Sequence, residues 1–128
     1  MRIEEEITAR IRALDHSGVF GSFEIAVLER HVSYDAMVRD HLRPDDYEAE
    51  EWDAGTRPRD DDSVRAELLE KIGLAQEALL GEHVLSVQRH LRACEALRWL
   101  LGDEEPLPEE GYLRALSTRY GVPVPEGV

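Results

Sequence analysis

Apolar residues recur every three or four positions along the second half of this chain, and this spacing constrains its fold more than any other feature. Over residues 82–101 the apolar stripe consists of Val84, Val87, Leu91, Cys94, Leu97 and Leu101. Such spacings place side chains on one face of an α-helix, whereas a half-buried strand needs alternation at every second residue. No alternating pattern persists over more than a few residues. The sequence therefore predicts an all-α fold.

The same periodicity predicts three more main helices, over residues 2–14, 22–42 and 63–80, and a short one within residues 110–121. Pro44 is expected to end the second helix, and Gly102 to follow the last residue of the fourth. We expect a four-helix-bundle-like single domain over residues 1–128, with a short fifth C-terminal helix. The tail, residues 121–128, is expected to fray.

The charge balance excludes some partners and favours others. The chain has 28 acidic and 15 basic residues, which gives a formal net charge of −13. A field of this sign repels nucleic acid and anionic membranes and favours a basic protein partner, or solubility alone. Cys94 is the only cysteine, so no intrachain disulfide can form. Without a signal-peptide pattern or a long apolar run, the chain is expected to be cytoplasmic.

An acidic connecting segment, residues 43–62, contains two large aromatic side chains. We single out as an interaction surface Tyr47, Trp52, Asp45, Asp46, Glu48, Glu50 and Glu51. Aromatic residues anchor many interfaces, and carboxylates around them would attract a basic partner. Two alternatives remain open: Tyr47 and Trp52 fold back over the apolar stripes of the protein itself, or the segment is disordered.

Several histidines lie on apolar stripes of the predicted helices. The candidate metal or ligand residues are Glu24, His31, His41, His83 and His90. His90 and Cys94 are four residues apart and could bind one ion from adjacent turns. Neither the Glu-x-x-His pattern of di-iron bundles nor His-Glu-x-x-His is present. The alternative is that these histidines form hydrogen bonds at the edge of the core, and no cofactor is expected.

Motifs for nucleophilic catalysis or phosphate binding are weak. No serine lies in a Gly-x-Ser-x-Gly elbow, and Cys94 lies on an apolar helix face, where a thiolate is disfavoured. Gly18 and Gly21 precede a helix without the lysine of a phosphate-binding loop. No catalysis is expected from these residues.

The predicted function is therefore interaction with other proteins. The predicted helix 22–42 has two apolar stripes, which suggests contact with two neighbours or with a second copy, so a homodimer is expected. A basic partner would be bound in the manner of an antitoxin or immunity protein, or the chain would be a subunit of a larger assembly. The alternative is a helical-bundle enzyme or ligand-binding protein that uses the core-facing histidine and glutamate residues.

Overall fold

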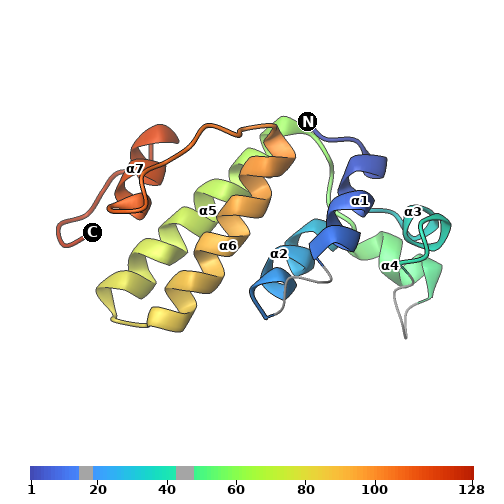
Figure 1. Ribbon diagram of the computed structural model, residues 1–128, viewed down its shortest axis with the longest axis horizontal. Coiled ribbons are helices and arrows are strands. Elements are labelled where there is room, and N and C mark those ends of the chain that lie inside the picture. The colour runs from blue at the N-terminus through green and yellow to red at the C-terminus, as the bar shows by residue number, and fades with distance from the viewer. Residues whose placement is uncertain (15–18, 43–47) are drawn as a thin grey trace.

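The computed structural model describes residues 1–14, 19–42 and 48–128, which form seven α-helices and no strand (Figure 1). The predicted all-α class is confirmed. In chain order the helices are α1 (Glu4–Leu14), α2 (Val19–Glu29), α3 (Tyr34–Arg39), α4 (Ala49–Gly55), α5 (Asp61–Leu80), α6 (Val84–Leu101) and α7 (Tyr112–Arg119).

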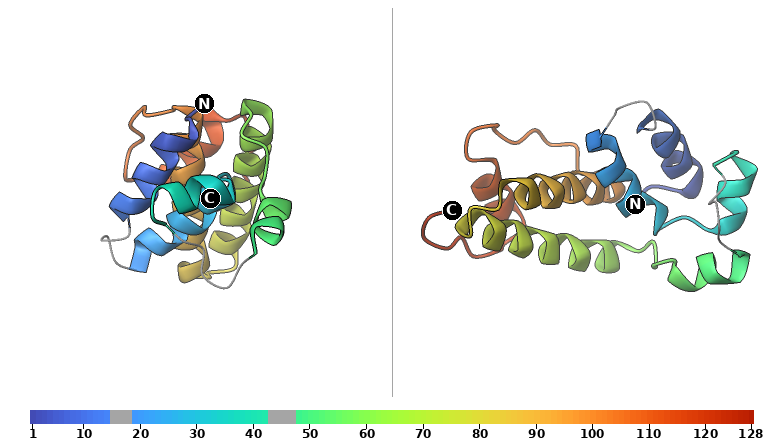
Figure 2. Two further views of the ribbon diagram at one scale, coloured as in Figure 1. Left: turned by 90° about the vertical axis from the view of Figure 1, so that its right-hand side faces the viewer. Right: turned by 90° about the horizontal axis from the view of Figure 1, so that it is seen from below.

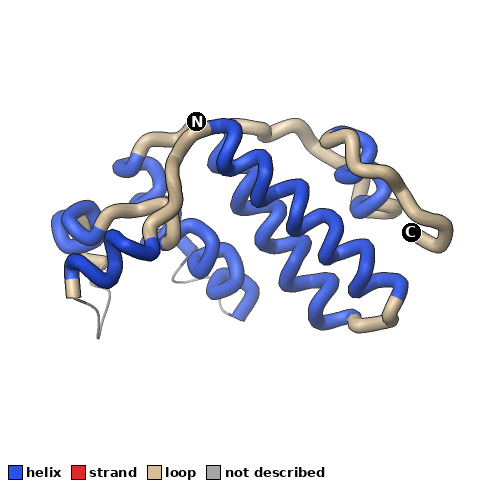
Figure 3. Tube along the Cα trace, turned by 180° about the vertical axis from the view of Figure 1, so that it is seen from behind, coloured by secondary structure: helices blue, strands red, loops and turns tan. Residues whose placement is uncertain are grey.

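The antiparallel hairpin of α5 and α6 is the central element of the fold (Figures 1 and 3). The side chain of Asp60 caps the start of α5 by accepting a hydrogen bond from the Ser63 backbone N–H at 2.8 Å. Gly102 ends α6 with a φ of 82°, a left-handed conformation that glycine adopts without the steric cost of a Cβ. Both long helices match their predicted ranges to within two residues at either end.

The remaining helices lie on opposite sides of this hairpin. Figure 2 shows an elongated molecule in which α1 to α4 gather toward one end and α7 lies toward the other. On one side α2 packs against α6 and α1 packs on α2, while on the other side α7 packs against α5. The predicted four-helix bundle is not confirmed, because the arrangement is a hairpin flanked by shorter helices.

The expected helix over residues 22–42 is two helices, α2 and α3. Ser33 separates them: its backbone is extended, and its hydroxyl caps α3 by accepting from the Ala36 N–H. The Glu4 carboxylate of α1 accepts hydrogen bonds from the Ser33 N–H at 3.0 Å and from its hydroxyl at 2.7 Å. This prediction was wrong because a residue distant in sequence stabilises the break.

One apolar core joins the flanking helices to the hairpin. Its fully buried members include Ile7 from α1, Leu28 from α2, Ile72 from α5 and Leu97 from α6. Cys94 lies among them with no exposed surface, and burial raises the pKa of its thiol to about 12. The core thus contains a cysteine in its neutral, unreactive form.

Part of the predicted acidic segment is helical, and the C-terminal end of the chain packs against the protein. Residues 49–55 of the segment expected to be a loop form α4. At the C-terminus the Gln76 side chain donates to the Pro123 carbonyl at 3.0 Å, and Val122 and Val128 pack against the core. The residues expected to fray therefore contact α5 and the core cluster.

Candidate functional site

Trp52, on α4, lies against the body of the protein. Its indole N–H donates to the Val32 carbonyl at 2.8 Å, and its partly buried ring packs against the core. The Val32 carbonyl at the break between α2 and α3 is thus satisfied by a side chain from the acidic segment. This geometry favours the alternative in which Trp52 folds back over the core.

The acidic residues around Trp52 that the structure describes face solvent. Glu48, Glu50 and Glu51 are all exposed, and no residue of α4 is fully buried. Tyr47, Asp45 and Asp46 lie outside the described residues. The described part of the segment thus presents carboxylates outward and its aromatic ring inward.

Glu24, on α2, is buried between α1 and α6. Its carboxylate lies 3.4 Å from the Arg10 guanidinium and 3.7 Å from that of Arg92. Burial raises the pKa of Glu24, and the positive charges of Arg10 and Arg92 only partly offset this. Glu24 therefore joins three helices through ion pairs and does not meet any of the candidate histidines.

His31 is buried, with 1% of its surface exposed, and its partner is Glu67 of α5. The His31 Nε2 lies 3.2 Å from the Glu67 carboxylate, which also pairs with Arg30 at 2.6 Å and Arg57 at 3.7 Å. Burial raises the pKa of Glu67, but the hydrogen bond with His31 and the charges of both arginines outweigh it, so the pKa is lowered. Glu67 is an ionised carboxylate inside the fold.

The other three histidines lie apart from His31. His41 follows α3 with a φ of 61° and is exposed, and His83 is exposed at the start of α6. His90 lines a groove between α2, α5 and α6. Within residues 1–14, 19–42 and 48–128, no three His, Cys, Asp or Glu side chains come together as a metal site. The predicted ligand set is therefore not assembled by the described residues.

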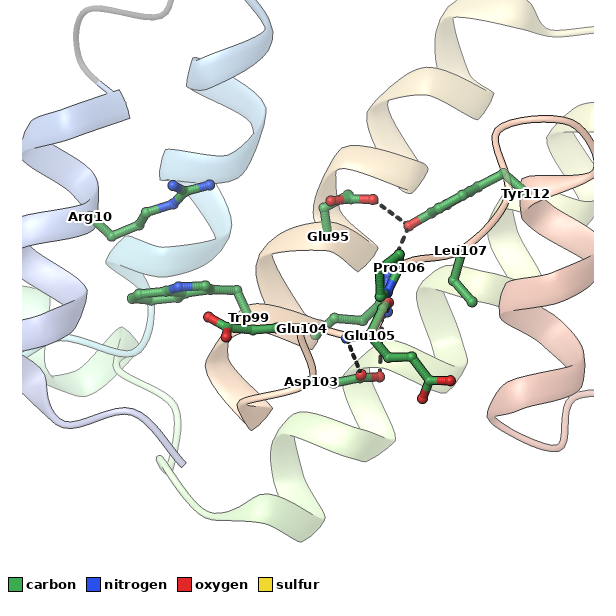
Figure 4. Close-up of a pocket in the computed structure, with 10 residues that line it drawn as sticks. Arg10, Glu95, Trp99, Asp103, Glu104, Glu105, Pro106, Leu107 and Tyr112 are labelled. Atoms are coloured by element: carbon green, nitrogen blue, oxygen red, sulfur yellow. Dashed lines mark hydrogen bonds and ion pairs between the residues drawn. The ribbon is translucent and has the colours of Figure 1, made fainter.

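A pocket of about 270 Å³ lies between α1, the end of α6 and the start of α7 (Figure 4). Arg10 and Trp99 lie on one side of it, and Tyr112 and Leu107 on the other. The Tyr112 hydroxyl donates to Glu95, and burial together with this carboxylate raises the pKa of Tyr112. The polar side chains that line the pocket thus have partners within the protein, in or beside the pocket.

Two residues that line this pocket, Arg98 and Asp103, belong to a group that we call the Asp103 cluster: Asp103, Arg98, Arg119 and Tyr120. Arg119 binds the Asp103 carboxylate with two hydrogen bonds, at 2.8 and 2.9 Å, and Tyr120 donates a third. Buried Arg98 approaches it at 3.4 Å. Burial raises the pKa of Asp103, but these hydrogen bonds outweigh it and hold the pKa well below its usual range. The cluster fixes α7 to the end of α6.

An exposed apolar surface lies at the far end of the hairpin, where α5 turns into α6. We call it the hairpin tip; Leu79, Leu80, Val84 and Leu85 are respectively 39%, 50%, 68% and 63% exposed. Leu79, Leu80 and Val84 are parts of predicted apolar stripes that no neighbouring helix covers. Exposed apolar residues that gather in one place mark contact surfaces more often than scattered ones do.

Glu67, Asp103 and the hairpin tip were not singled out from the sequence. Glu67 could have been found from the sequence, because it is a carboxylate within the apolar stripe of residues 63–80. A carboxylate that is buried in this way must pair with a cation. The chain around Asp103 gave no comparable signal, because its partners Arg119 and Tyr120 lie on another helix.

Comparison with protein-family models, with curated proteins and with solved structures found no match to this chain. In the part of the chain that the structure describes, no helix is both long and apolar enough to cross a membrane. The fold and its contacts are therefore the basis for inferring a function.

Proposed function

We propose that this chain works through contacts with other proteins and forms a homodimer through the hairpin tip. The observation that carries the proposal is the exposure of Leu79, Leu80, Val84 and Leu85 on either side of one turn. Covering apolar surface stabilises an association by roughly 25 cal/mol per Å² before the costs of association. A second copy offers the same apolar surface to the first, as two-fold dimers require.

The net charge of each copy gives this dimer a characteristic salt dependence. Two chains of −13 repel each other, and added salt screens this repulsion. The dimer should therefore become tighter as the salt concentration rises. A complex with a basic protein should instead become weaker, because salt screens its attraction.

Sedimentation equilibrium across the micromolar range, at low and high salt, tests the dimer. We expect the double variant Leu80→Gln/Leu85→Gln to weaken dimerisation at least tenfold. The matched control is Ile3→Gln, which changes an exposed apolar residue, 57% exposed, away from the tip. A wild-type protein that stays monomeric throughout, or a tip variant that dimerises like the control, contradicts the proposal.

The exposed carboxylates at the start of α4 support a second contact, with a basic protein. Glu48, Glu50 and Glu51 face solvent beside the ring of Trp52, and their charge would attract and orient such a partner. The role would resemble that of an antitoxin or immunity protein, or of a subunit in an assembly. An enzyme that uses the candidate histidines has less support, because their side chains lie apart.

Affinity capture from the host with charge variants tests this second contact. The variant Glu48→Gln/Glu50→Gln/Glu51→Gln should lose a basic protein that wild type retains at low salt. The control Glu109→Gln/Glu110→Gln/Glu126→Gln removes equal charge from exposed positions elsewhere and should retain it. Equal capture by both triple variants would rule out α4 as the contact surface.

A further inference from the structure

A groove between α2, α5 and α6 combines basic walls with an apolar floor. Its volume is about 470 Å³, within the range of roughly 300–1,000 Å³ that small-molecule sites occupy. Every charged residue that lines it is basic or is a histidine: Arg30, Lys71, Arg89 and His90. We call it the basic groove.

This distribution runs against the charge of the whole chain. Acidic residues outnumber basic ones by 28 to 15, yet none of those that the structure describes lines the groove. The cations come from separate parts of the chain: Arg30 directly follows α2, Lys71 lies on α5 and Arg89 lies on α6. A cleft lined by one sign of charge focuses the field and raises the local concentration of the opposite ion. The groove is therefore a region of an acidic protein that attracts anions.

Two of these cations have no carboxylate partner in the part of the chain that the structure describes. Within the described residues, neither Lys71 nor Arg89 forms an ion pair, whereas Arg30 binds Glu67 at 2.6 Å. Lys71 is the only lysine of the chain and is partly buried. The Arg89 guanidinium lies 5.5 Å from the centre of the Phe23 ring. Bringing like charges together without a counter-ion costs free energy, which a bound anion would recover.

The floor of the groove is suited to an apolar body. Phe23 and Val27 of α2 and Ala93 of α6 line the groove with apolar side chains. The hydroxyl of Ser86 lies at the edge and can donate a hydrogen bond. Apolar contacts with a few convergent polar groups are the usual composition of a small-molecule site.

We propose that the basic groove binds a small organic anion with an apolar body, of the class of aliphatic carboxylates. Lys71 and Arg89 hold the carboxylate, and Phe23, Val27 and Ala93 contact the hydrocarbon. His90 reports occupancy: burial and the charges of Lys71 and Arg89 lower its pKa, and a bound carboxylate offsets those charges. Among the described residues, the charged groups that line the groove with His90 are Lys71 of α5, Arg89 of α6 and Arg30, which directly follows α2.

Titration calorimetry with four probes tests the site: octanoate, octan-1-ol, octylammonium and acetate. Octanoate should bind at least tenfold more tightly than each of the others, because it alone carries both the anion and the apolar chain. Binding should raise the pKa of His90, followed by the NMR shift of its imidazole protons. Equal affinity for octanoate and octan-1-ol, or for octanoate and acetate, overturns the proposal.

Variants of the groove cations, compared with a control variant elsewhere, test whether octanoate binds in the basic groove. Lys71→Met and Arg89→Met should each weaken octanoate binding at least fivefold. Arg65→Met removes the same charge from α5 at an exposed residue that lies over Tyr120, and should change the affinity less than twofold. If all three variants bind octanoate alike, the groove is not the site. This result is independent of dimerisation, which the tip variants test separately.

Discussion

The Asp103 cluster and the basic groove both gather cations, but they use them in opposite ways. In the Asp103 cluster, Arg98 and Arg119 meet on one carboxylate that also accepts from Tyr120. In the basic groove, Lys71 and Arg89 lie near each other without a carboxylate among the described residues. The positive charges of the Asp103 cluster are thus balanced by a carboxylate of the same chain. Those of Lys71 and Arg89 are not balanced by any carboxylate of the described residues.

The difference separates structural charge from charge available for binding. The donors of buried Arg98 are directed at Asp103, the Tyr112 hydroxyl and the Glu105 carbonyl, so this arginine stabilises the fold and has little capacity left for a ligand. Cations that remain partly exposed and unpaired contribute little to the fold and keep their capacity. Perturbed pKa values occur in both regions, so the pKa alone does not identify a site.

The largest expected effect comes from breaking the Asp103 cluster. Asp103→Asn removes the negative charge and leaves Arg98 buried without its counter-ion, so the free energy of unfolding should fall by about 2 kcal/mol. Urea denaturation at neutral pH measures this change. Glu104→Gln alters a neighbouring but exposed carboxylate and should have a much smaller effect. Equal effects would show that Asp103 is not the centre of the cluster.

The contribution of Asp103 to the stability of the fold should be lost over a predictable range of acidic pH. The folded protein holds the pKa of Asp103 below its unfolded value of about 3.9, so the stabilisation is complete above that pH. It decreases as the pH falls through that value toward the folded pKa. The stability difference between wild type and Asp103→Asn should therefore narrow below about pH 4. A difference that stays constant down to pH 2.5, about the lower limit of such a titration, would contradict the assignment.

Protonation of His90 in the basic groove is expected to have a smaller effect on stability. Here the charged form is the protonated one, whereas in Asp103 it is the deprotonated one. His90 has a lowered pKa, so the unfolded chain binds its proton more readily, and stability decreases as the pH falls below the unfolded value of about 6.5. His90→Asn should reduce the loss of stability between pH 7 and pH 5, as followed by thermal unfolding. Exposed His41 gives the control, and His41→Asn should lose stability as wild type does.

The smallest expected effect is that of the groove cations on stability. Lys71→Met should change the free energy of unfolding by less than about 0.5 kcal/mol, because no ion pair is lost. Chemical denaturation of this variant beside Asp103→Asn compares the two regions directly. If Lys71→Met lowers the free energy of unfolding as much as Asp103→Asn does, Lys71 stabilises the fold. The two regions would then not differ in the way that we propose.

The long helices were predictable because their determinants are local. The run Asp60–Asp62 and Gly102 act within a few residues of the helix ends that they set. The break between α2 and α3 was not predictable, since Tyr34, Met37 and Val38 continue the helical periodicity across it. Its determinant is Glu4, on another helix. Periodicity detects which face is apolar, but it cannot detect a hydrogen bond from a residue distant in sequence.

The distinction between local determinants and contacts between distant residues applies to the candidate sites as well. The sequence indicated that His31 would lie toward the core, and it does, but its partner Glu67 comes from α5. His41 was placed on a helix face that the break removes, so it is exposed. The basic groove depends on three helices that are separated in the sequence, and only their packing brings Lys71, Arg89 and His90 together.

Cys94 makes the interior of this protein chemically observable. Its thiol is fully buried, and burial raises its pKa to about 12, so an alkylating reagent cannot modify it in the closed structure. Modification must wait for α2 or α5 to separate from α6. Because the chain has no other cysteine, the rate of labelling reports this opening at a single known position. The wild-type protein thus already contains a probe of how often its own core opens, without any engineered label.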